Sequence, residues 1–212
     1  MLPKIIHQIA GKSPSKLVSV CLGSWQSLLD FNYEIIYWDD ESLADFIGKH
    51  YPFALEAFLT ARNTAEAADI ARYLLVYHYG GYYIDWDISL NNISLFKDLY
   101  ISKPNGYFVI DPLNDTLASE HFCSPPGNNY LHQLVTDIVA TYDRGERDLM
   151  NTPQYSGPYR MRSTMRKFST DNFTFIPVKE IFEYSYDEIR GQSIFRKKGI
   201  MTHFWEHSWI NQ

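Results

Sequence analysis

The first part of the chain alternates short apolar runs with longer segments of helical periodicity. Residues 4–9 (KIIHQI) form a mainly apolar run that predicts a buried parallel strand, and residues 33–38 (YEIIYW) predict a second strand. Between them, residues 16–30 place apolar side chains at helical spacing. Residues 41–62 predict two further helices, which break before Pro52 because proline disfavours helical backbone in the residue that precedes it.

Residues 64–89 (TAEAADIARYLLVYHYGGYYIDWDIS) carry the clearest pattern in the chain. Thr64 is the expected N-cap of a helix, because its hydroxyl can accept a hydrogen bond from the first turn. Gly80 and Gly81 are expected to end this helix, since glycine adopts a left-handed C-cap without steric cost. The apolar positions at helical spacing are Ile70, Ala71, Leu74 and Leu75.

Two aspartates follow this helix. Residues 82–84 (YYI) predict a strand, so Asp85 and Asp87 stand at or just beyond its end, where their carboxylates can converge on one side. Carboxylates held close together repel each other unless a cation binds, and their oxygens suit hard ions such as Mg²⁺ or Mn²⁺. A nucleotide diphosphate would complete the coordination sphere of such an ion. A solvated turn without a metal is the alternative interpretation of a bare D-x-D.

The second half of the chain continues the alternation of helices and strands. A short helix is expected near residues 94–99, and an amphipathic helix over residues 129–145, capped by Asn128 or Asn129. Strands are expected at residues 106–110, 121–124, 173–177 and 200–205. This order predicts an α/β fold with a central, mostly parallel twisted sheet flanked by helices, in a single domain over residues 1–212 that a longer protein could contain.

Composition and charge exclude several classes of protein. A net charge of −6 and a pI near 5.6 disfavour nucleic acid as a partner, because binding to a phosphate backbone depends on clustered lysine and arginine. The sequence contains neither a signal peptide nor an apolar run of about 18 residues, so we expect a cytoplasmic protein without a transmembrane segment. One local basic cluster is either a solvated helix face or a patch for an anion: Arg160, Arg162, Arg166 and Lys167.

Four other residues are of types that often have a specific role. Cys21 and Cys123 are too few for a disulfide framework and lack C-x-x-C spacing, so both are expected to be buried thiols. His7, within an apolar run, is expected to be a hydrogen-bonded core residue rather than a ligand. Asp39 follows a predicted strand and is either a site residue at the edge of the sheet or the N-cap of the next helix.

Asp69 and Arg72 lie one helical turn apart, which by itself predicts only an intrahelical ion pair. Together with the aspartates, however, residues 68–72 (ADIAR) and 79–87 (YGGYYIDWD) resemble the block A-S-D-I-x-R…G-G-x-Y-x-D-x-D of a sugar-transferase superfamily. This superfamily includes capsular polysaccharide transferases, fungal initiating mannosyltransferases and the glucosyltransferase domains of large clostridial toxins.

Three further segments extend the resemblance. Residues 3–9 (PKIIHQI) are similar to the opening strand of the family, and residues 203–209 (HFWEHSW) to its closing H-x-W-x-x-S-W. Residues 152–160 resemble a T-G-P turn near the acceptor side, with Ser156 in place of the threonine. The chain departs from the pattern at Ala10, where the family usually has a tryptophan that packs on the nucleotide base.

The resemblance implies a GT-A-like fold and a metal-dependent, retaining hexosyltransferase. The donor would be a nucleotide sugar, with a UDP-sugar favoured over a GDP-sugar, and the acceptor a hydroxyl of a glycan or glycoprotein. Asp69, Arg72 and Asp87 would be catalytic. Asp85, Asp87 and His203 would bind the metal, and the imidazole favours Mn²⁺ over Mg²⁺. Donor binding would involve Ile9, Asp69, Arg72, Asp85, Ser208 and Trp209.

Two other functions fit parts of the sequence. A phosphotransferase of the haloacid-dehalogenase type would use Asp85 and Asp87 as nucleophile and acid, but that motif normally opens its domain and has threonine or valine where this chain has Ser89. A non-catalytic, divalent-cation-dependent carbohydrate-binding module would stack its tyrosines on sugar rings. Such a module would bind sugar without nucleotide.

Overall fold

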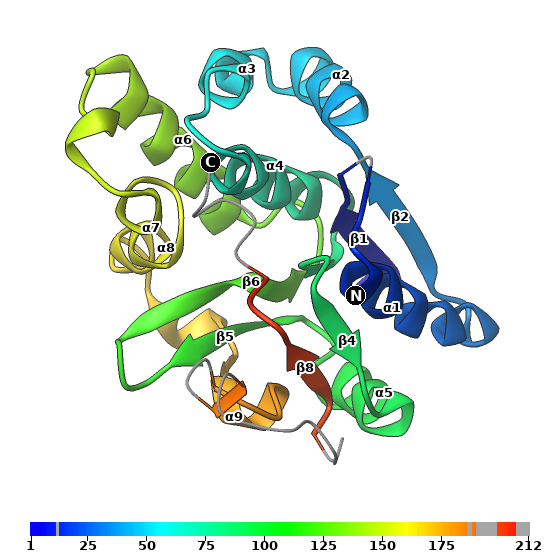
Figure 1. Ribbon diagram of the computed structural model, residues 1–212. Helices are drawn as coiled ribbons and strands as arrows, with labels where there is room; N and C mark the ends of the chain where they lie inside the picture. Colours follow the sequence, from blue (N-terminus) through cyan, green and yellow to red (C-terminus); the bar gives the residue numbers. More distant parts are fainter. Residues whose placement is uncertain (12, 186–187, 190–198, 207–212) are drawn as a thin grey trace.

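The computed structural model describes residues 1–11, 13–185, 188–189 and 199–206. Figure 1 shows a central twisted sheet with helices packed on both faces. The strands are β1 (Ile5–Ile9), β2 (Glu34–Trp38), β3 (Gly81–Ile84), β4 (Ile88–Leu90), β5 (Tyr107–Asp111), β6 (Thr116–Ser124), β7 (Phe175–Pro177) and β8 (Met201–His203). The α-helices are α1 (Lys16–Ser24), α2 (Asp40–His50), α3 (Pro52–Leu59), α4 (Thr64–Tyr79), α5 (Ile93–Ser102), α6 (Asn129–Asp143), α7 (Thr152–Tyr155), α8 (Pro158–Met165) and α9 (Val178–Ile181).

The main sheet has the strand order β2-β1-β3-β6-β5-β7. Strand β1 pairs in parallel with β2 and β3, and β5 pairs in parallel with β7. Strand β6 runs antiparallel to both β3 and β5, so it is the reversed strand within this sheet. The sheet is therefore mostly parallel, as the sequence predicts. Strands β4 and β8 form a separate antiparallel pair.

Helix α4 and strand β3 form the unit expected from residues 64–89, with one correction at its start. The N-cap is Asn63 rather than Thr64, because the Asn63 side chain accepts a hydrogen bond from the amide of Glu66. The helix ends at Gly80, which has a φ of 68°. A Cβ on Gly81 would lie 2.4 Å from the carbonyl oxygen of Ile5, so glycine is needed for β3 to approach β1.

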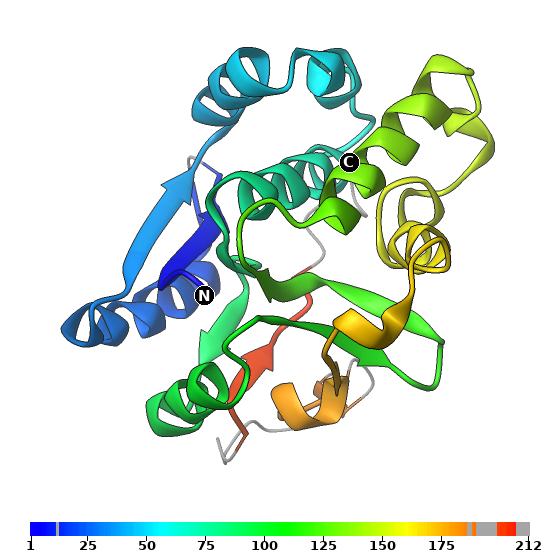
Figure 2. The same cartoon turned by 180° about the vertical axis from the view of Figure 1, so that it is seen from behind.

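Several predicted boundaries differ from the structure. The helix expected over residues 16–30 is α1 followed by a 3₁₀ helix, η1 (Trp25–Phe31), and the chain adds two further 3₁₀ turns, η2 (Arg147–Leu149) and η3 (Thr170–Asn172). Strand β6 begins five residues before the predicted 121–124, because polar residues at its centre hide the strand pattern. The last strand, β8, lies outside the main sheet and pairs with β4 (Figure 2). The sequence did not predict this pairing.

The sheet separates two clusters of buried apolar side chains. One contains residues of α4 and α6, and the other contains residues of η1 and α5. Neighbouring residues of β3 divide between them, with Tyr83 in the first cluster and Tyr82 in the second, as the alternation of side chains along a strand requires. Cys21 and Cys123 are buried free thiols, as expected. In the described parts of the chain, no helix is both long and apolar enough to cross a lipid bilayer.

His7 is a core residue, as the sequence predicts. Its Nε2 donates to the carbonyl oxygen of Gly80 (3.0 Å), while its Nδ1 accepts from the indole N–H of Trp38 (3.2 Å). His121 is buried in a comparable way between the carbonyl oxygen of Tyr83 (3.0 Å) and the hydroxyl of Tyr107 (2.7 Å). Burial lowers the pKa of each imidazole to about 4, because the charged form would lose its hydration.

These two histidines should make the stability of the protein depend on pH. An unfolded chain binds protons at a histidine pKa of about 6.5, so below this pH the unfolded state binds more protons than the folded state. The contribution of these two histidines to the free energy of unfolding should therefore fall as the pH falls from 6.5 toward 4, by about 2 kcal/mol for each histidine at pH 5. Urea unfolding near pH 7 and near pH 5 measures this loss.

The variant His7→Gln isolates one of the two contributions. Glutamine keeps a donor and an acceptor for Gly80 and Trp38, but it does not titrate. The loss of stability between the two pH values should be smaller in the variant by about 2 kcal/mol. An equal loss in the parent and the variant would show that His7 is not kept neutral by burial.

Candidate functional site

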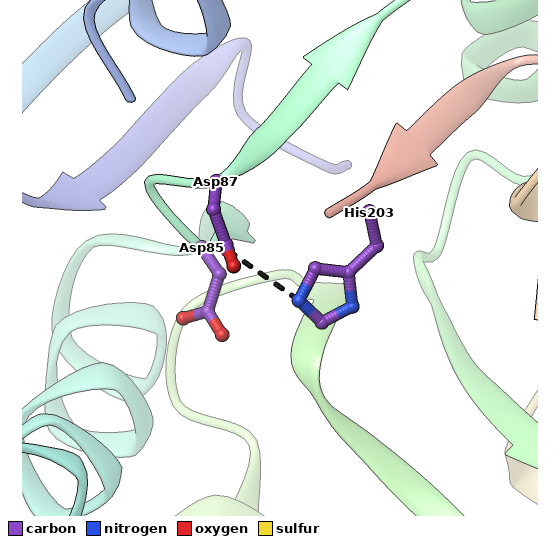
Figure 3. Close-up of side chains that lie close together, drawn as sticks. All are labelled: Asp85, Asp87 and His203. Carbon is purple, nitrogen blue, oxygen red and sulfur yellow. Dashed lines mark ion pairs between the residues drawn. The ribbon is translucent and has the colours of Figure 1, made fainter. Parts of the chain in front are cut away.

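The turn between β3 and β4 positions the two aspartates. The backbone amide of Asp85 donates to the carbonyl oxygen of Glu120 on β6 (2.9 Å), which extends the pairing of β3 with β6 by one residue. The amide of Ile88 donates to the carbonyl oxygen of Asp85 (3.1 Å), which closes a tight turn around Trp86. Asp85 and Asp87 therefore lie close together just after β3, and both carboxylates lie near His203 (Figure 3).

Strand β8 brings His203 to the aspartates from the far end of the chain. His203 pairs with Ile88 across the two-stranded sheet, and its Nε2 lies 3.4 Å from Oδ1 of Asp87 (Figure 3). Its ring stacks on Trp205 at a centroid distance of 4.2 Å. Asp85, Asp87 and His203 each offer one ligand atom, and these atoms all lie within 4.8 Å of one another. The three residues expected to bind a metal are thus brought together.

Asp87 also holds the backbone that follows β8. Its carbonyl oxygen accepts from the amide of Phe204 (3.1 Å), and its Oδ2 accepts from the amide of Glu206 (2.7 Å). Only 4% of Asp87 is exposed, so it is a buried residue. The Glu206 carboxylate accepts in turn from the hydroxyl of Ser15, the N-cap of α1 (3.0 Å). The carboxylate of Asp87 thus has a structural contact in addition to its place beside His203.

Arg72 lies between two carboxylates and is almost fully buried. Its guanidinium is 3.3 Å from Oδ1 of Asp85 and 3.5 Å from Oδ1 of Asp69. It also donates to the carbonyl oxygens of Ala68 and Ser119. Burial alone would lower the pKa of the guanidinium, but the two carboxylates raise it, so Arg72 stays charged. The intrahelical pair predicted from the sequence is therefore one part of a larger network.

Asp69 extends this network toward α7 and α8. Its Oδ2 accepts a hydrogen bond from the hydroxyl of Ser156 (2.7 Å), the residue at the position of the family's threonine. A Cβ on Gly157 would approach the same oxygen to 3.5 Å, so the turn before α8 packs closely on the carboxylate. Burial raises the pKa of Asp69 to about 6, although Arg72 and Ser156 oppose this shift.

Neighbouring charges give the metal-binding candidates different proton affinities. Burial raises the pKa of Asp85, against the pull of Arg72. Burial also opposes the charge of Asp87, but His203 and the amide of Glu206 hold the pKa of Asp87 below its ordinary value. The pKa of His203 is raised because Asp87 in particular stabilises the imidazolium more than burial disfavours it. Glu120, whose pKa is raised by burial, adds a further carboxylate.

The site has an excess of negative charge that suits a divalent cation. Four carboxylates lie around it, from Asp69, Asp85, Asp87 and Glu120, and the nearby cationic groups are Arg72 and, when protonated, His203. Two carboxylates and one imidazole are ligands that Mn²⁺ accepts readily. The donor atoms present therefore fit such an ion.

A surface pocket of about 390 Å³ lies beside the end of β1. Ala10 lines it, at the position where the resembled family has its tryptophan, and the other lining residues are Gly11, Tyr37, Trp38, Asp39 and Ser42. Trp86 stands next to this pocket, since a Cβ on Gly11 would lie 3.4 Å from its ring. The side chain of Ile9, which we expected to bind the donor, packs against the apolar core instead of lining this pocket.

Asp39 is a helix cap. Its side chain accepts from the amide of Ser42 (2.8 Å), and the Ser42 hydroxyl lies 3.0 Å from the amide of Asp39, which completes a capping box at the start of α2. The capping interpretation of Asp39 is therefore confirmed. Ser208 and Trp209, expected at the donor site, lie outside the described residues.

The basic cluster near α8 is neither a fully solvated face nor an unpaired anion patch. Arg162 and Arg166 pair with Asp115, and Lys167 pairs with Asp137 at 2.7 Å. Arg160 turns inward and donates to the carbonyl oxygen of Tyr155 (3.0 Å). Each of the four cations thus has a partner within the chain.

Two residues of the site were not predicted from the sequence. The hydroxyl of Tyr83 donates to Oδ1 of Asp85 (2.6 Å), and Glu120 lies 3.9 Å from Nδ1 of His203. The sequence predicts Tyr83 only as a residue of a strand. Glu120 is the one acidic residue within the strand sequence TLASEHFCS, and this isolated charge is a signal that could have marked it.

Comparisons with known proteins agree with this geometry. Residues 15–103 match the family model described as the glycosyltransferase sugar-binding region containing the DXD motif. The chain is 39% identical over 197 residues to inositol phosphoceramide mannosyltransferase 2 of Schizosaccharomyces pombe, covering 82% of this chain and 56% of the relative. It is 38% identical over 94 residues to inositol phosphoceramide mannosyltransferase 3 of the same yeast, covering 42% of this chain and 25% of the relative.

The fold is similar to that of a solved glycosyltransferase, PaToxG, with a TM-score of 0.56 and 17% identity over 78% of this chain and 69% of that structure. At this identity the likeness concerns the fold alone. The chain spans about half the length of one of these curated relatives and about a quarter of the other. Residues 15–103 are thus similar to the glycosyltransferase sugar-binding region that contains the DXD motif.

Proposed function

We propose that this chain is a metal-dependent glycosyltransferase domain that transfers a hexosyl group from a nucleotide-diphosphate donor to a hydroxyl group of a glycan-type acceptor. The observation that carries the proposal is the convergence of Asp85, Asp87 and His203 on one point, with donor atoms within 4.8 Å of one another. The family match over residues 15–103 includes the two aspartates and therefore supports the same site.

The residues of the site have different roles in the proposed reaction. Asp85, Asp87 and His203 would hold Mn²⁺, or Mg²⁺ in its place, and this ion when bound stabilises the negative charge that grows on the departing diphosphate. Arg72 pairs with the carboxylates of Asp69 and Asp85 and favours their charged forms. Asp69 would then accept hydrogen bonds from hydroxyl groups of the donor sugar.

We propose that the transfer retains the anomeric configuration, as the resemblance to the family implies. The bond between the anomeric carbon and the diphosphate oxygen breaks, and the acceptor oxygen forms its bond on the same face. The acceptor proton passes to the departing phosphate, so no side chain is needed as a nucleophile. This differs from retaining glycosidases, in which a second carboxylate forms a covalent intermediate.

The mannosyltransferase relatives favour a mannosyl group as the transferred sugar, and their names point to an inositol phosphoceramide as an acceptor. Both assignments are proposals for this chain. The nucleotide is either UDP or GDP, and a panel of nucleotide sugars distinguishes the two. The pocket beside Ala10 is the place that we propose for the base of this nucleotide.

The variant Asp87→Asn tests the metal-dependent function. Asparagine keeps the shape of the side chain and an oxygen for the amide of Glu206, but it loses the charge that a cation needs. In the parent, UDP or GDP should raise the melting temperature only when Mn²⁺ is present, because a ligand stabilises the state that it binds. The variant should lose this shift, and its rate of sugar transfer should fall by at least about 10²-fold.

Asp45→Asn on the exposed side of α2 is the matched control, and it should behave like the parent. A normal Mn²⁺-dependent shift and rate in Asp87→Asn would refute the proposed function. Asparagine is preferred to alanine here because alanine would leave the buried amide of Glu206 and the ring of His203 without their partner.

The variant Arg72→Met tests whether Arg72 stabilises the site. Methionine fills a similar volume but leaves Asp69 and Asp85 without their buried cation. The free energy of unfolding should fall by about 3–5 kcal/mol, as when one partner of a buried ion pair is removed. Arg162→Met removes a partly exposed partner of Asp115 and should cost less than about 1 kcal/mol. Similar, small losses in both variants would contradict this role for Arg72.

The variant Ala10→Trp tests where the nucleotide base lies. A ring placed in the pocket beside Tyr37 should stack on the base and tighten nucleotide binding by about 1 kcal/mol. Isothermal titration with Mn²⁺ and nucleotide measures this change. Unchanged or weaker binding by a folded variant would mean that the base lies elsewhere, or that Trp86 or Tyr37 already covers it.

A further inference from the structure

His203 has one ring nitrogen that faces the aspartates and one that does not. Nε2 lies 3.4 Å from Oδ1 of Asp87, on the side of the proposed cation (Figure 3). Nδ1 is buried and makes no hydrogen bond within the described residues. An unpaired nitrogen in a buried ring is costly, and it leaves the position of the imidazole proton undetermined. The group nearest to satisfying it is the carboxylate of Glu120, whose Oε1 lies 3.9 Å away.

Glu120 reaches this position because β6 is irregular at this point. Phe122 of β6 pairs with Phe108 of β5, whereas Leu117 pairs with Ile110, so β6 bulges between these two pairs. A bulge re-aims the side chains that it contains, and bulges are common beside active sites. The same short stretch supplies the carbonyl oxygen of Glu120 to the amide of Asp85. One irregular segment thus positions both the first aspartate and the carboxylate beside His203.

We propose that Glu120 is a positioning residue, which accepts the Nδ1 proton of His203 and so leaves the Nε2 lone pair free for the divalent cation. This inference rests on the proposed metal-dependent function. The distance of 3.9 Å exceeds a hydrogen bond, so the bond that we propose requires the Glu120 side chain to move toward the ring. Carboxylate groups that orient metal-binding histidines in this way fix the tautomer and increase the basicity of the ligand.

The surroundings of the imidazole favour this arrangement. Trp205 stacks on the ring at 4.2 Å, and Phe182 lies at a centroid distance of 5.8 Å, so the plane of the ring is held by aromatic contacts. These two aromatic side chains carry no charge. The carboxylates near the ring come from Asp87, beside Nε2, and from Glu120, beside Nδ1. A cation held by the Nε2 lone pair would require the ring proton to be on Nδ1, the nitrogen beside Glu120.

The experiment compares Glu120→Gln with Glu120→Leu. Glutamine removes the negative charge but keeps an acceptor oxygen, whereas leucine removes both. The contact of His203 with Glu120 is read from ¹H–¹⁵N spectra of protein labelled at histidine with diamagnetic Mg²⁺ bound, in which a downfield Nδ1 proton marks a hydrogen bond to a carboxylate. The signals of His203 are assigned from the spectrum of His203→Ala. The affinity for Mn²⁺ alone is measured by electron paramagnetic resonance.

With Mg²⁺ bound, we expect a downfield Nδ1 proton on His203 in the parent, a smaller displacement in Glu120→Gln, and none in Glu120→Leu. Binding of Mn²⁺ should weaken about 10–100-fold in Glu120→Leu and less in Glu120→Gln, on the scale of other residues that orient metal ligands. In the His203→Ala background, Glu120→Leu should add little further loss, because the two residues then no longer act through each other.

Two results would overturn the proposal. One is a His203 Nδ1 proton signal in the Mg²⁺-bound parent that is the same as in Glu120→Leu. The other is an equal loss of Mn²⁺ affinity in both Glu120 variants with an unchanged Nδ1 proton signal, which would mean that Glu120 acts only through its charge. A parent that binds neither Mg²⁺ nor Mn²⁺ would refute the proposed function, whereas a parent that binds them without any effect of Glu120 would refute this inference alone.

Discussion

The burial of Arg72 between Asp69 and Asp85 is the interaction on which the candidate site depends. A guanidinium taken out of water must be paired, and here two carboxylates and two carbonyl oxygens surround it. Because Arg72 and Asp69 lie on α4 and Asp85 follows β3, the pairing fixes the helix relative to the end of the strand. The turn that contains Asp87 is then held from a third side by β6, through the hydrogen bond between the Asp85 amide and Glu120.

The network also explains why acidic groups can gather at this edge of the sheet. Arg72 compensates part of the charge of Asp69 and Asp85, while His203 and the Glu206 amide compensate that of Asp87. The compensation is incomplete, since burial still raises the pKa of Asp85 and Glu120. A cation bound as we propose would relieve this residual repulsion and stabilise the folded chain, and this gain would couple the proposed metal and donor binding at one place.

The local parts of the site could be predicted from the sequence, whereas the contacts between distant segments could not. Helix α4, its glycine stop and the position of Asp85 and Asp87 follow from residues within one short stretch. The sequence predicts Thr64 as the N-cap of α4, whereas the structure has Asn63. The two residues are neighbours, and both residue types cap helices well. The position of Glu120 depends on a bulge in β6, and the pairing of β4 with β8 depends on tertiary packing. Neither feature produces a periodic pattern in the sequence. His203 was found only through the resemblance to a family.

The bond between Asp87 and the backbone of Glu206 joins residues 119 positions apart in the chain. Contacts of such long range form only after the intervening chain has been ordered, and the entropy of closing the loop must be overcome first. Helix α4 is held by local hydrogen bonds and can form early, whereas the imidazole of His203 reaches the aspartates only when β8 has docked on β4. The complete set of proposed metal ligands therefore exists only in chains whose last strand is in place, so the proposed cation binding would report on the end of folding rather than its beginning.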